Sequence, residues 1–482
     1  MSRFGIGAGT PPVPVAELGR VHLVGVGGAG MSAVALLLAA RGLTVSGSDA
    51  ADGPALPGLR AAGVDVHVGH DAALVAGVDT LVVSSAVRES NPELAAARAA
   101  GLRVLHRSQA LASLMADRDG VAVAGAHGKT TTSAMIATGL RAVGADPSFA
   151  IGGTVLTDDG PLGGGRDGAG AFVAEADESD GSFLAYEPLV SVVTNVEPDH
   201  LDHYGTREAF EDAFVAFAGR LRPGGLLVAC ADDEGARRLV ARVREPLVAR
   251  GVDVLTYGRA DDADVRVGEL VAGEGRWTFD VATTSTRATV ALAVPGAHNA
   301  LDAAAAWAVL VRLGVGGEDA ARALGAFRGT GRRFEDRGTA GGVRVVDDYA
   351  HHPTEVAALL RAARSVAGDG RVLALFQPHL YSRTRTFADE FGAAFDLADV
   401  VVVTDVYAAR EDPDPEVTGA LVVDRVPTPG KAVFVADRLD AARAVADAAR
   451  PGDLLLTVGA GDVTTLGPVV LEHLAARERD AS

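Results

Sequence analysis

The chain has 482 residues, too many for one ordinary hydrophobic core, and this length alone predicts about three domains. Lys and Arg number 44 against 63 Asp and Glu, which gives a formal net charge of −19. That charge argues against a general attraction to nucleic acid or to an anionic membrane surface. With 48% hydrophobic and 22% charged residues, the composition is that of a folded globular protein.

The sequence predicts a cytoplasmic protein with no membrane insertion. Cys230 is the single cysteine, so no internal disulfide can form, and this fits a reducing compartment. The first residues, MSRFGIGAGTPPVPV, lack the basic and apolar segments of a signal peptide, and the apolar run VALLLAA is too short to cross a bilayer.

Apolar strand-like runs alternate with alanine-rich helical stretches after a Pro/Gly-rich segment, 1–18, that we expect to be a flexible tail. The runs RVHLVGV, LTVSGSD, VDVHVG, TLVVSSAV and LRVLHR predict a first domain over 19–113. Alternation of this kind favours a mostly parallel sheet with helices on both faces. We therefore expect a Rossmann-like fold there.

Two further α/β units follow. The central one, over 114–330, begins with VAVAGAHGKTTT and continues into a Thr-rich stretch typical of antiparallel strands, followed by two helices. The last, over 331–482, contains the runs VRVVDDYA, RVLALFQPH, VVVTDVY and DLLLTVGAGD. The predicted fold class is therefore α/β in three domains, with a central P-loop ATPase-like domain between two Rossmann-like domains.

The stretch GVGGAG, residues 25–30, follows a predicted strand and opens a predicted helix. Gly25, Gly27 and Gly30 fit a dinucleotide fingerprint, and Asp49 lies where such folds place an acid for ribose. A helix N-terminus offers free N–H groups to a pyrophosphate. The motif alone favours NAD(P), and a tight turn without a ligand is the structural alternative.

A second glycine motif, GAHGKTTT at 125–132, contains one of only two lysines in the chain, Lys129, the other being Lys431. Val123 stands where a full Walker pattern has glycine, so the motif is a shortened GxxGKT. Backbone amides would bind phosphates, Lys129 would reach the outer two, and Thr130 would ligate Mg²⁺. Because arginine is used almost everywhere else, we interpret Lys129 as functional.

Acidic clusters follow two later predicted strands. EADESD places Glu175, Asp177, Glu178 and Asp180 after AFVA, and NVEPDHLDHY places His200 after LVSVVT. Open α/β sheets bind ligands at the carboxyl ends of their strands, and oxygen ligands beside phosphates suit Mg²⁺. Zinc is the alternative metal, but the HExxH pattern and paired cysteines are absent from the sequence.

In this order, the motifs resemble those of the ATP-dependent Mur ligases. The resemblance covers essentially the whole chain after the tail and rests on GVGGAGMS, GAHGKTTT, EADESDGSF, NVEPDHLDHY, PGAHNALDAAAA, GRRFE, DDYAHHPTEV and FQPHLYSRT. GVGGAGMS, EADESDGSF and DDYAHHPTE are most similar to the members that add alanine. The resemblance implies a UDP sugar instead of NAD(P) in the first domain, ATP in the central domain and the amino acid in the third.

The resemblance also implies roles for individual residues. It assigns the UDP sugar to Gly27, Gly28, Ala29, Gly30, Met31, Ser32, Asp49, Ser84 and Ser85. It assigns ATP to Gly125, His127, Gly128, Lys129, Thr130, Thr131, His298, Asn299, Arg333 and Asp348. Mg²⁺ or Mn²⁺ would be held by Thr130, Glu175 and His200, and the amino acid and carboxylate by Tyr349, His351 and Arg383. The expected catalytic residues are Lys129, Glu175, His200 and His351.

The implied reaction joins L-alanine to the lactyl carboxylate of UDP-N-acetylmuramate. ATP would convert the carboxylate to an acyl phosphate, which the amine of alanine would attack. Positioning and charge neutralisation would supply most of the rate enhancement, and His351 is one candidate for the base. Reactive groups in three domains suggest closure on binding, and we expect a monomer or weak dimer.

Two positions depart from the family pattern. Wider relatives carry a lysine, modified to a carbamate, shortly after the metal histidine, but no lysine lies between Lys129 and Lys431 here. We therefore predict that no carbamate is needed. Some alanine-adding relatives have arginine where this chain has Leu380, so carboxylate binding would rest on Arg383 or Arg385.

Three other hypotheses stay open at this point. One is a ligase of muropeptide recycling, which attaches a tripeptide to the same UDP sugar. Another is an NAD(P)-dependent dehydrogenase, based on GVGGAG and Asp49. The third is a nucleotide-dependent switch without ligation, which would turn over ATP regardless of the UDP sugar.

Overall fold

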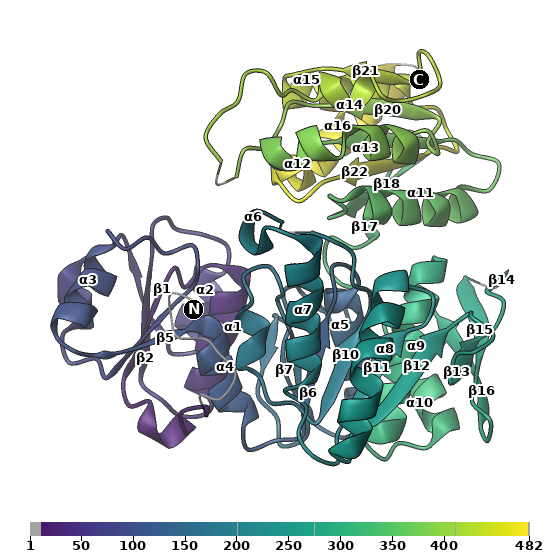
Figure 1. Cartoon of the computed structure of the whole chain (residues 1–482). Helices are drawn as coiled ribbons and strands as arrows, with labels where there is room; N and C mark the ends of the chain where they lie inside the picture. Colours follow the sequence, from purple (N-terminus) through teal and green to yellow (C-terminus); the bar gives the residue numbers. More distant parts are fainter. Residues whose placement is uncertain (1–10, 200, 274, 410, 481–482) are drawn as a thin grey trace. The chain divides into compact units, whose positions relative to one another are not determined.

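The structure, a computed structural model, describes residues 11–199, 201–273, 275–409 and 411–480. Within these residues lie three β-sheets that follow one another along the chain, which confirms the predicted three-part α/β fold class (Figure 1). The chain divides into two compact units. One holds most residues up to Arg328, and the other holds Gly329–Ser482 together with Gly275–Trp277 and Ala293–Asn299. The predicted domain boundaries stay a prediction.

The N-terminal sheet is parallel, with strand order β3-β2-β1-β4-β5. Its strands are β1 (Val21–Val24), β2 (Val45–Asp49), β3 (Asp65–Val68), β4 (Thr80–Val83) and β5 (Arg103–His106). Its helices are α1 (Ala29–Ala40), α2 (Leu56–Ala61), α3 (Pro92–Ala99) and α4 (Arg107–Met115). Every residue of β1 and β4 is buried, as expected for strands covered on both faces. Before the sheet, Val15–Glu17 forms a 3₁₀ turn and Leu18 is fully buried.

The central sheet has the order β14-β15-β13-β12-β11-β10-β6-β9-β7-β8, with β16 paired to β15. The strands are β6 (Gly120–Ala124), β7 (Ser148–Ala150), β8 (Gly165–Arg166), β9 (Phe172–Glu175), β10 (Val190–Val193), β11 (Leu226–Cys230), β12 (Asp253–Gly258), β13 (Val265–Val267), β14 (Val271–Gly273), β15 (Arg276–Ala282) and β16 (Arg287–Leu292). The pairings from β12 through β10 and β6 to β9 are parallel, whereas β13 and β15 pair antiparallel, as the Thr-rich stretch predicted.

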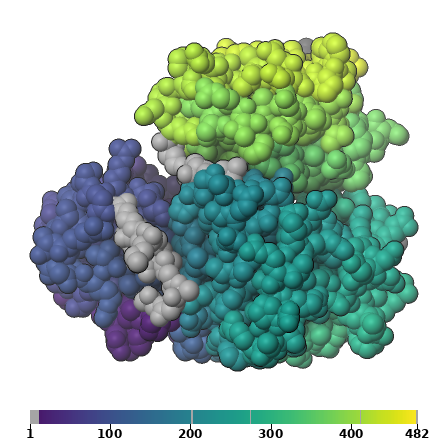
Figure 2. Space-filling view, viewed as in Figure 1, coloured from purple at the N-terminus to yellow at the C-terminus, as the bar shows by residue number. Residues whose placement is uncertain are grey.

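The helices of this domain are α5 (Lys129–Ala142), α6 (Leu201–Tyr204), α7 (Arg207–Ala218), α8 (Glu234–Ala249), α9 (Ala297–Arg312) and α10 (Gly317–Leu324). The N-terminal and central domains pack directly together, because α1 contacts β7 and β8. Figure 2 shows them as adjoining surfaces, the first in purple and blue and the second in teal.

The C-terminal sheet has the order β17-β18-β22-β19-β20-β21, parallel except for the pair β17 and β18. The strands are β17 (Glu335–Ala340), β18 (Val343–Asp348), β19 (Val372–Phe376), β20 (Val400–Val403), β21 (Ala432–Phe434) and β22 (Leu454–Val458). The helices are α11 (Pro353–Ala367), α12 (Tyr381–Thr386), α13 (Ala388–Phe395), α14 (Ala420–Val423), α15 (Arg438–Ala448) and α16 (Leu466–Asp480).

Both faces of this sheet are buried, since successive residues of a strand point to opposite faces. In β19, Ala374 and Phe376 pack into a core with α11 and α13, whereas Leu373 and Leu375 pack into a core with α15 and α16. The near-continuous apolar runs seen in the sequence are explained by this double burial. Across the described ranges, no helix is long and apolar enough to cross a membrane.

Candidate active site

The predicted phosphate loop connects β6 to α5, and Lys129 is the first residue of the helix. Gly128 precedes it with φ +83°, a left-handed conformation that favours glycine. A Cβ at Gly128 would also lie 2.7 Å from Oδ1 of Asp302, a buried residue of α9. The loop therefore has its glycine where conformation and space both require one.

Asn195 holds this loop from the segment that directly follows the neighbouring strand β10. Its Oδ1 accepts a hydrogen bond from the His127 amide at 3.0 Å, and its Nδ2 donates to the His127 carbonyl, also at 3.0 Å. Thr194 Oγ1 donates to the same carbonyl at 2.5 Å. The motif NVEPDHLDHY, interpreted from sequence as a metal site, thus begins with a residue, Asn195, that fixes the phosphate loop. Its predicted ligand His200 lies outside the described residues.

The ammonium of Lys129 is held by the loop itself and by the acidic cluster. Nζ donates to the carbonyl oxygens of Gly125 at 2.6 Å and Ala126 at 3.2 Å, and to Glu178 Oε1 at 2.9 Å. Burial raises the pKa of Glu178 to about 7, although the nearby ammonium opposes the shift. Burial works against a charged Lys129, but the surrounding carboxylates, Glu178 first, raise its pKa, so this lysine carries a positive charge.

Thr130 and Glu175, predicted from sequence to share a metal, lie in direct contact. Thr130 Oγ1, at the start of α5, donates to Glu175 Oε1 at 3.0 Å, and the Gly152 amide donates to Glu175 Oε2 at 2.7 Å. Glu175 ends β9, which pairs with β6, so both residues lie at the carboxyl edge of the sheet. A hydroxyl and a carboxylate are oxygen ligands of the kind that Mg²⁺ prefers.

The fingerprint of the first domain lines a cavity of about 840 Å³, which we call the N-terminal cavity. Of the residues expected to bind the UDP sugar, the lining includes Gly27, Gly28, Ala29, Gly30, Met31, Asp49 and Ser84. Over the described residues it includes neither Ser32, whose Oγ donates to the Ala29 carbonyl, nor Ser85, whose Oγ donates to Asp180. Asp49 accepts a hydrogen bond from the Gly27 amide at 2.8 Å and so fixes the glycine turn.

Arg107 is a candidate residue that the sequence analysis missed. It begins α4 directly after β5, lines the N-terminal cavity, and donates through Nη2 to Asp177 of the acidic cluster. A Cβ at Gly30 would lie 2.6 Å from Arg107 Nη1, so the last glycine of the fingerprint admits the guanidinium. Although burial opposes it, Arg107 holds the pKa of Asp177 well below its usual range. The available signal was an arginine at the carboxyl end of a parallel strand.

A second cavity, of about 200 Å³, lies between the N-terminal and central domains, and we call it the junction cavity. Gly30 and Arg107 line it from the first domain, and Lys129, Glu175 and Asp177 line it from the second. The two glycine motifs, which the sequence separates by about a hundred residues, thus meet at one cavity with both signs of charge.

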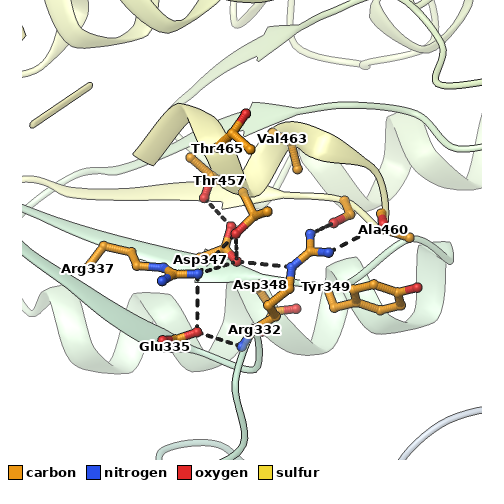
Figure 3. A network of polar contacts seen from close by, with 12 residues as sticks. Arg332, Glu335, Arg337, Asp347, Asp348, Tyr349, Thr457, Ala460, Val463 and Thr465 are labelled. Carbon is orange, nitrogen blue, oxygen red and sulfur yellow. Dashed lines mark hydrogen bonds and ion pairs between the residues drawn. The ribbon is translucent and has the colours of Figure 1, made fainter. Parts of the chain in front are cut away.

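In the C-terminal unit, Asp347 anchors the segment GRRFE to the sheet (Figure 3). The Asp347 carboxylate is fully buried and accepts hydrogen bonds from Thr457 Oγ1 at 2.6 Å and Thr464 Oγ1 at 2.8 Å. Arg332 Nε donates to it at 3.3 Å, and Arg332 Nη2 donates to the Gly459 carbonyl at 2.7 Å. Arg332 therefore anchors GRRFE to the sheet, whereas Nη1 of its neighbour Arg333 lies 3.6 Å from Glu355 Oε1.

Asp348, Tyr349, His351 and Arg333, all predicted from sequence, gather at the end of β18. Asp348 accepts hydrogen bonds from the Phe334 and Ala350 amides, each at 2.8 Å, and burial raises its pKa to about 6. The Arg333 guanidinium lies 5.2 Å from the Tyr349 ring centre, a cation–π contact.

His351 has one nitrogen engaged in the same group. Its Nδ1 lies 3.0 Å from the Tyr349 carbonyl and 3.2 Å from Glu355 Oε2. Because both partners are acceptors, Nδ1 carries the proton, and in the neutral ring Nε2 is an acceptor. This is the tautomer that a base acting through Nε2 requires.

The remaining predicted residues occupy separate elements. His298 and Asn299 lie in the first turn of α9, where Asn299 donates to the Pro295 carbonyl at 2.6 Å. Arg383 lies in α12 and is nearly buried, at 8% exposure. Arg385, the alternative for carboxylate binding, forms an ion pair with Asp414 at 2.5 Å.

Fold and site together describe an enzyme that brings two nucleotide loops to one charged cavity, and the comparison with protein families agrees. Three family models match in order: Mur ligase family, catalytic domain, over 20–119; Mur ligase middle domain, over 123–310; and Mur ligase, glutamate ligase domain, over 332–461. The chain belongs to the Mur ligase family and is an ATP-dependent ligase.

Individual relatives are more specific. The chain is 62% identical to the UDP-N-acetylmuramate--L-alanine ligase of Kineococcus radiotolerans, with 96% of this chain and 98% of that protein covered. It is 53% identical to the enzyme of the same name from Renibacterium salmoninarum, with 98% and 99% covered. Among solved structures, it is similar to the UDP-N-acetylmuramate-alanine ligase of Thermotoga maritima, at 30% identity and a TM-score of 0.78, over 96% of this chain and 100% of that one.

Proposed function

We propose that this chain joins L-alanine to the lactyl carboxylate of UDP-N-acetylmuramate at the expense of ATP, in peptidoglycan precursor synthesis. The observation that carries the proposal is the junction cavity, which Gly30 and Lys129 line together. A carboxylate on a sugar nucleotide bound by the first loop would therefore approach the terminal phosphate of ATP bound by the second. Identities of 50 to 62% with eight relatives named for this reaction support the same conclusion.

The first chemical step is attack of a lactyl carboxylate oxygen on the γ-phosphorus, which forms an acyl phosphate and releases ADP. Two anions must meet in this step, so positive charge has to lie beside both. Lys129 supplies it on the ATP side and Arg107 on the sugar-nucleotide side. Attack of the alanine amine on the acyl carbon then expels phosphate and leaves the amide.

Thr130 and Glu175 would hold a divalent cation, with Mg²⁺ the best match to their oxygen atoms. When bound, the ion would neutralise charge on the phosphates. The chain's own contribution is to fix both ligands at the sheet edge, Glu175 through the Gly152 amide and Thr130 through its place in α5.

Tyr349, His351 and Arg333 of the C-terminal unit would receive the amino acid and the nucleotide. His351 Nε2 is the atom that we expect to accept the ammonium proton, because Nδ1 is occupied by the Tyr349 carbonyl and Glu355. Arg383 remains our candidate for a carboxylate contact. We also propose a cytoplasmic location and a monomer or weak dimer.

The recycling ligase remains the second candidate. The chain is similar to a murein peptide ligase of Psychrobacter arcticus at 26% identity and a TM-score of 0.68, both lower than for the alanine ligase of Thermotoga maritima. Comparing L-alanine with a tripeptide as the acceptor separates the two ligases. We expect turnover with L-alanine and none with the tripeptide.

The test of the proposed function is phosphate release from Mg·ATP by the purified chain, with each of the other substrates omitted in turn. We expect steady release only when UDP-N-acetylmuramate and L-alanine are both present. Steady release without the UDP sugar would contradict ligation and would favour a nucleotide switch.

A further inference from the structure

A buried carboxylate next to the N-terminal cavity has no part in the mechanism above. Glu93 lies in the first turn of α3 and is fully buried. Its Oε2 accepts from His22 Nε2 at 3.0 Å and from Ser48 Oγ at 2.7 Å. Its Oε1 accepts from His70 Nδ1 at 3.0 Å and from the Asp71 amide at 3.2 Å. A carboxylate has about four lone-pair positions, so these donors saturate Glu93.

The same contacts decide the charge of Glu93. Burial alone would raise its pKa, but the hydrogen bonds from His22, Ser48 and His70 together bring the pKa below its usual value. The start of a helix also favours negative charge. Glu93 is therefore ionised and can only accept hydrogen bonds.

An ionised Glu93 fixes the tautomer of His70. The Ser48 hydroxyl gives its one hydrogen to Glu93, so at 3.0 Å from His70 Nδ1 the Ser48 oxygen can only accept. Both neighbours of Nδ1 are acceptors, so Nδ1 carries the proton. In the neutral ring, Nε2 is then an acceptor without a hydrogen.

His70 has access to a ligand. Its side chain is 26% exposed and lines the N-terminal cavity. Gly27 and Gly28 lie between β1 and the start of α1, which suits phosphate, whereas His70 follows β3, two strands further along the sheet. His70 therefore lies toward the nucleoside end of the cavity.

We propose that His70 Nε2 accepts a hydrogen bond from the nucleoside of the bound nucleotide, and that Glu93 is the positioning residue that keeps Nε2 an acceptor. The inference rests on the proposed function, which supplies a uridine nucleotide as the ligand. Uridine offers two kinds of donor, the N3–H of uracil and the hydroxyls of ribose. A nucleobase with an acceptor at N3, such as cytosine, would place its N3 lone pair against the lone pair of His70 Nε2.

The test is calorimetric titration of the full chain with UDP, 2′-deoxy-UDP, 3′-deoxy-UDP and N3-methyl-UDP. We expect the analogue that lacks the recognised donor to bind about tenfold more weakly than UDP, the usual size of one hydrogen bond. The identity of that analogue distinguishes base from ribose. The variant His70→Leu should bind UDP about tenfold more weakly and no longer distinguish UDP from that analogue.

His67→Leu is the matched control. His67 lies on β3, pairs with Asp65 at 3.3 Å and is more exposed than His70, so its loss should leave UDP binding unchanged. Equal affinity of UDP for His70→Leu and for the unaltered chain would overturn the inference, as would equal binding of all four nucleotides to the unaltered chain. Failure of the unaltered chain to bind UDP would instead remove the proposed function, and this inference with it.

Glu93→Gln tests the positioning role. The amide can donate to Nδ1, which frees the ring to move its proton to Nε2, so this variant should lose the same discrimination as His70→Leu. Adding His70→Leu to Glu93→Gln should change UDP affinity no further, because Glu93 acts through His70. The ¹⁵N spectrum of the histidine rings in the unaltered chain should show His70 protonated at Nδ1. Protonation at Nε2 alone would overturn the assignment, even if Glu93→Gln failed to fold.

Discussion

GVGGAG and GAHGKTTT both form a glycine turn between a strand and a helix, and they obtain their positive charge in different ways. In GAHGKTTT the cation, Lys129, is the first residue of α5 and belongs to the motif. In GVGGAG the motif has no cation, and Arg107 arrives from the start of α4, beside Gly30. The ATP loop can therefore be recognised from one stretch of sequence. The positive charge beside GVGGAG cannot, because it comes from a residue that only folding brings to the loop.

The largest effect should come from Lys129→Arg, which keeps the charge but changes its shape. The guanidinium cannot take the place of an ammonium held by two loop carbonyls and Glu178. We expect a loss of roughly 100-fold or more in kcat, from the loss of charge-assisted phosphate contacts.

Lys431→Arg is the control for this variant, because Lys431 is the only other lysine and pairs with Asp396 at 3.0 Å in the C-terminal unit. Its turnover should match that of the unaltered chain. Near-native turnover of Lys129→Arg would mean that the comparison between the two loops is wrong.

Arg107→Met should separate the two loops. If Arg107 serves the sugar nucleotide, its loss should raise the KM for UDP-N-acetylmuramate about 10- to 100-fold and change the KM for ATP much less. Arg98→Met, which removes an exposed arginine paired with Glu89, should change neither. An equal rise in both KM values would show that Arg107 does not distinguish the loops.

Asn195→Asp should weaken the ATP loop alone. The new carboxylate still accepts from the His127 backbone amide. It also places an oxygen against the His127 carbonyl, to which the Asn195 side-chain amide donates in the unaltered chain. We expect about a tenfold loss in kcat/KM for ATP, with UDP binding unchanged in a separate titration. A variant with native kinetics would show that the loop holds its conformation without Asn195.

A smaller effect concerns acid stability. Arg107 holds the pKa of Asp177 below its value in the unfolded chain. The pair therefore stabilises the fold at pH values above the unfolded-state pKa of Asp177. This contribution to stability disappears as the pH falls through the folded-state pKa. Urea unfolding should show Arg107→Met less stable than the unaltered chain near neutral pH, with the difference narrowing in acid. A constant difference would contradict the assignment.

The removal of bicarbonate should have no effect on the rate. No lysine lies between Lys129 and Lys431, so the central domain has no side chain there to form a carbamate. A fall in rate that bicarbonate restores would refute the prediction.

Local patterns were sufficient for the fold and for part of the site. Strands such as β6 and β19 are apolar because both faces are buried, and this signal lies within a few residues. The proximity of Thr130 and Glu175 also followed from one rule, that ligands gather at the carboxyl ends of parallel strands.

Other residues could not be predicted, because their roles depend on contacts between distant segments. Arg107 reaches Asp177, and Glu93 links strands β1 and β2 to His70, with nothing in either local sequence to indicate it. In GRRFE, the pattern does not show that Arg332 binds Asp347 while Arg333 pairs with Glu355. Such pairings are set by packing rather than by periodicity.

The most direct test of the account follows the oxygen atoms of the carboxylate. UDP-N-acetylmuramate labelled with ¹⁸O in the lactyl carboxylate would be turned over with ATP and L-alanine, and the released phosphate analysed by mass spectrometry. If the two glycine loops bring the carboxylate to the γ-phosphate at the junction cavity, each phosphate should carry one labelled oxygen. Phosphate without label would show that no acyl phosphate forms, and would contradict the account.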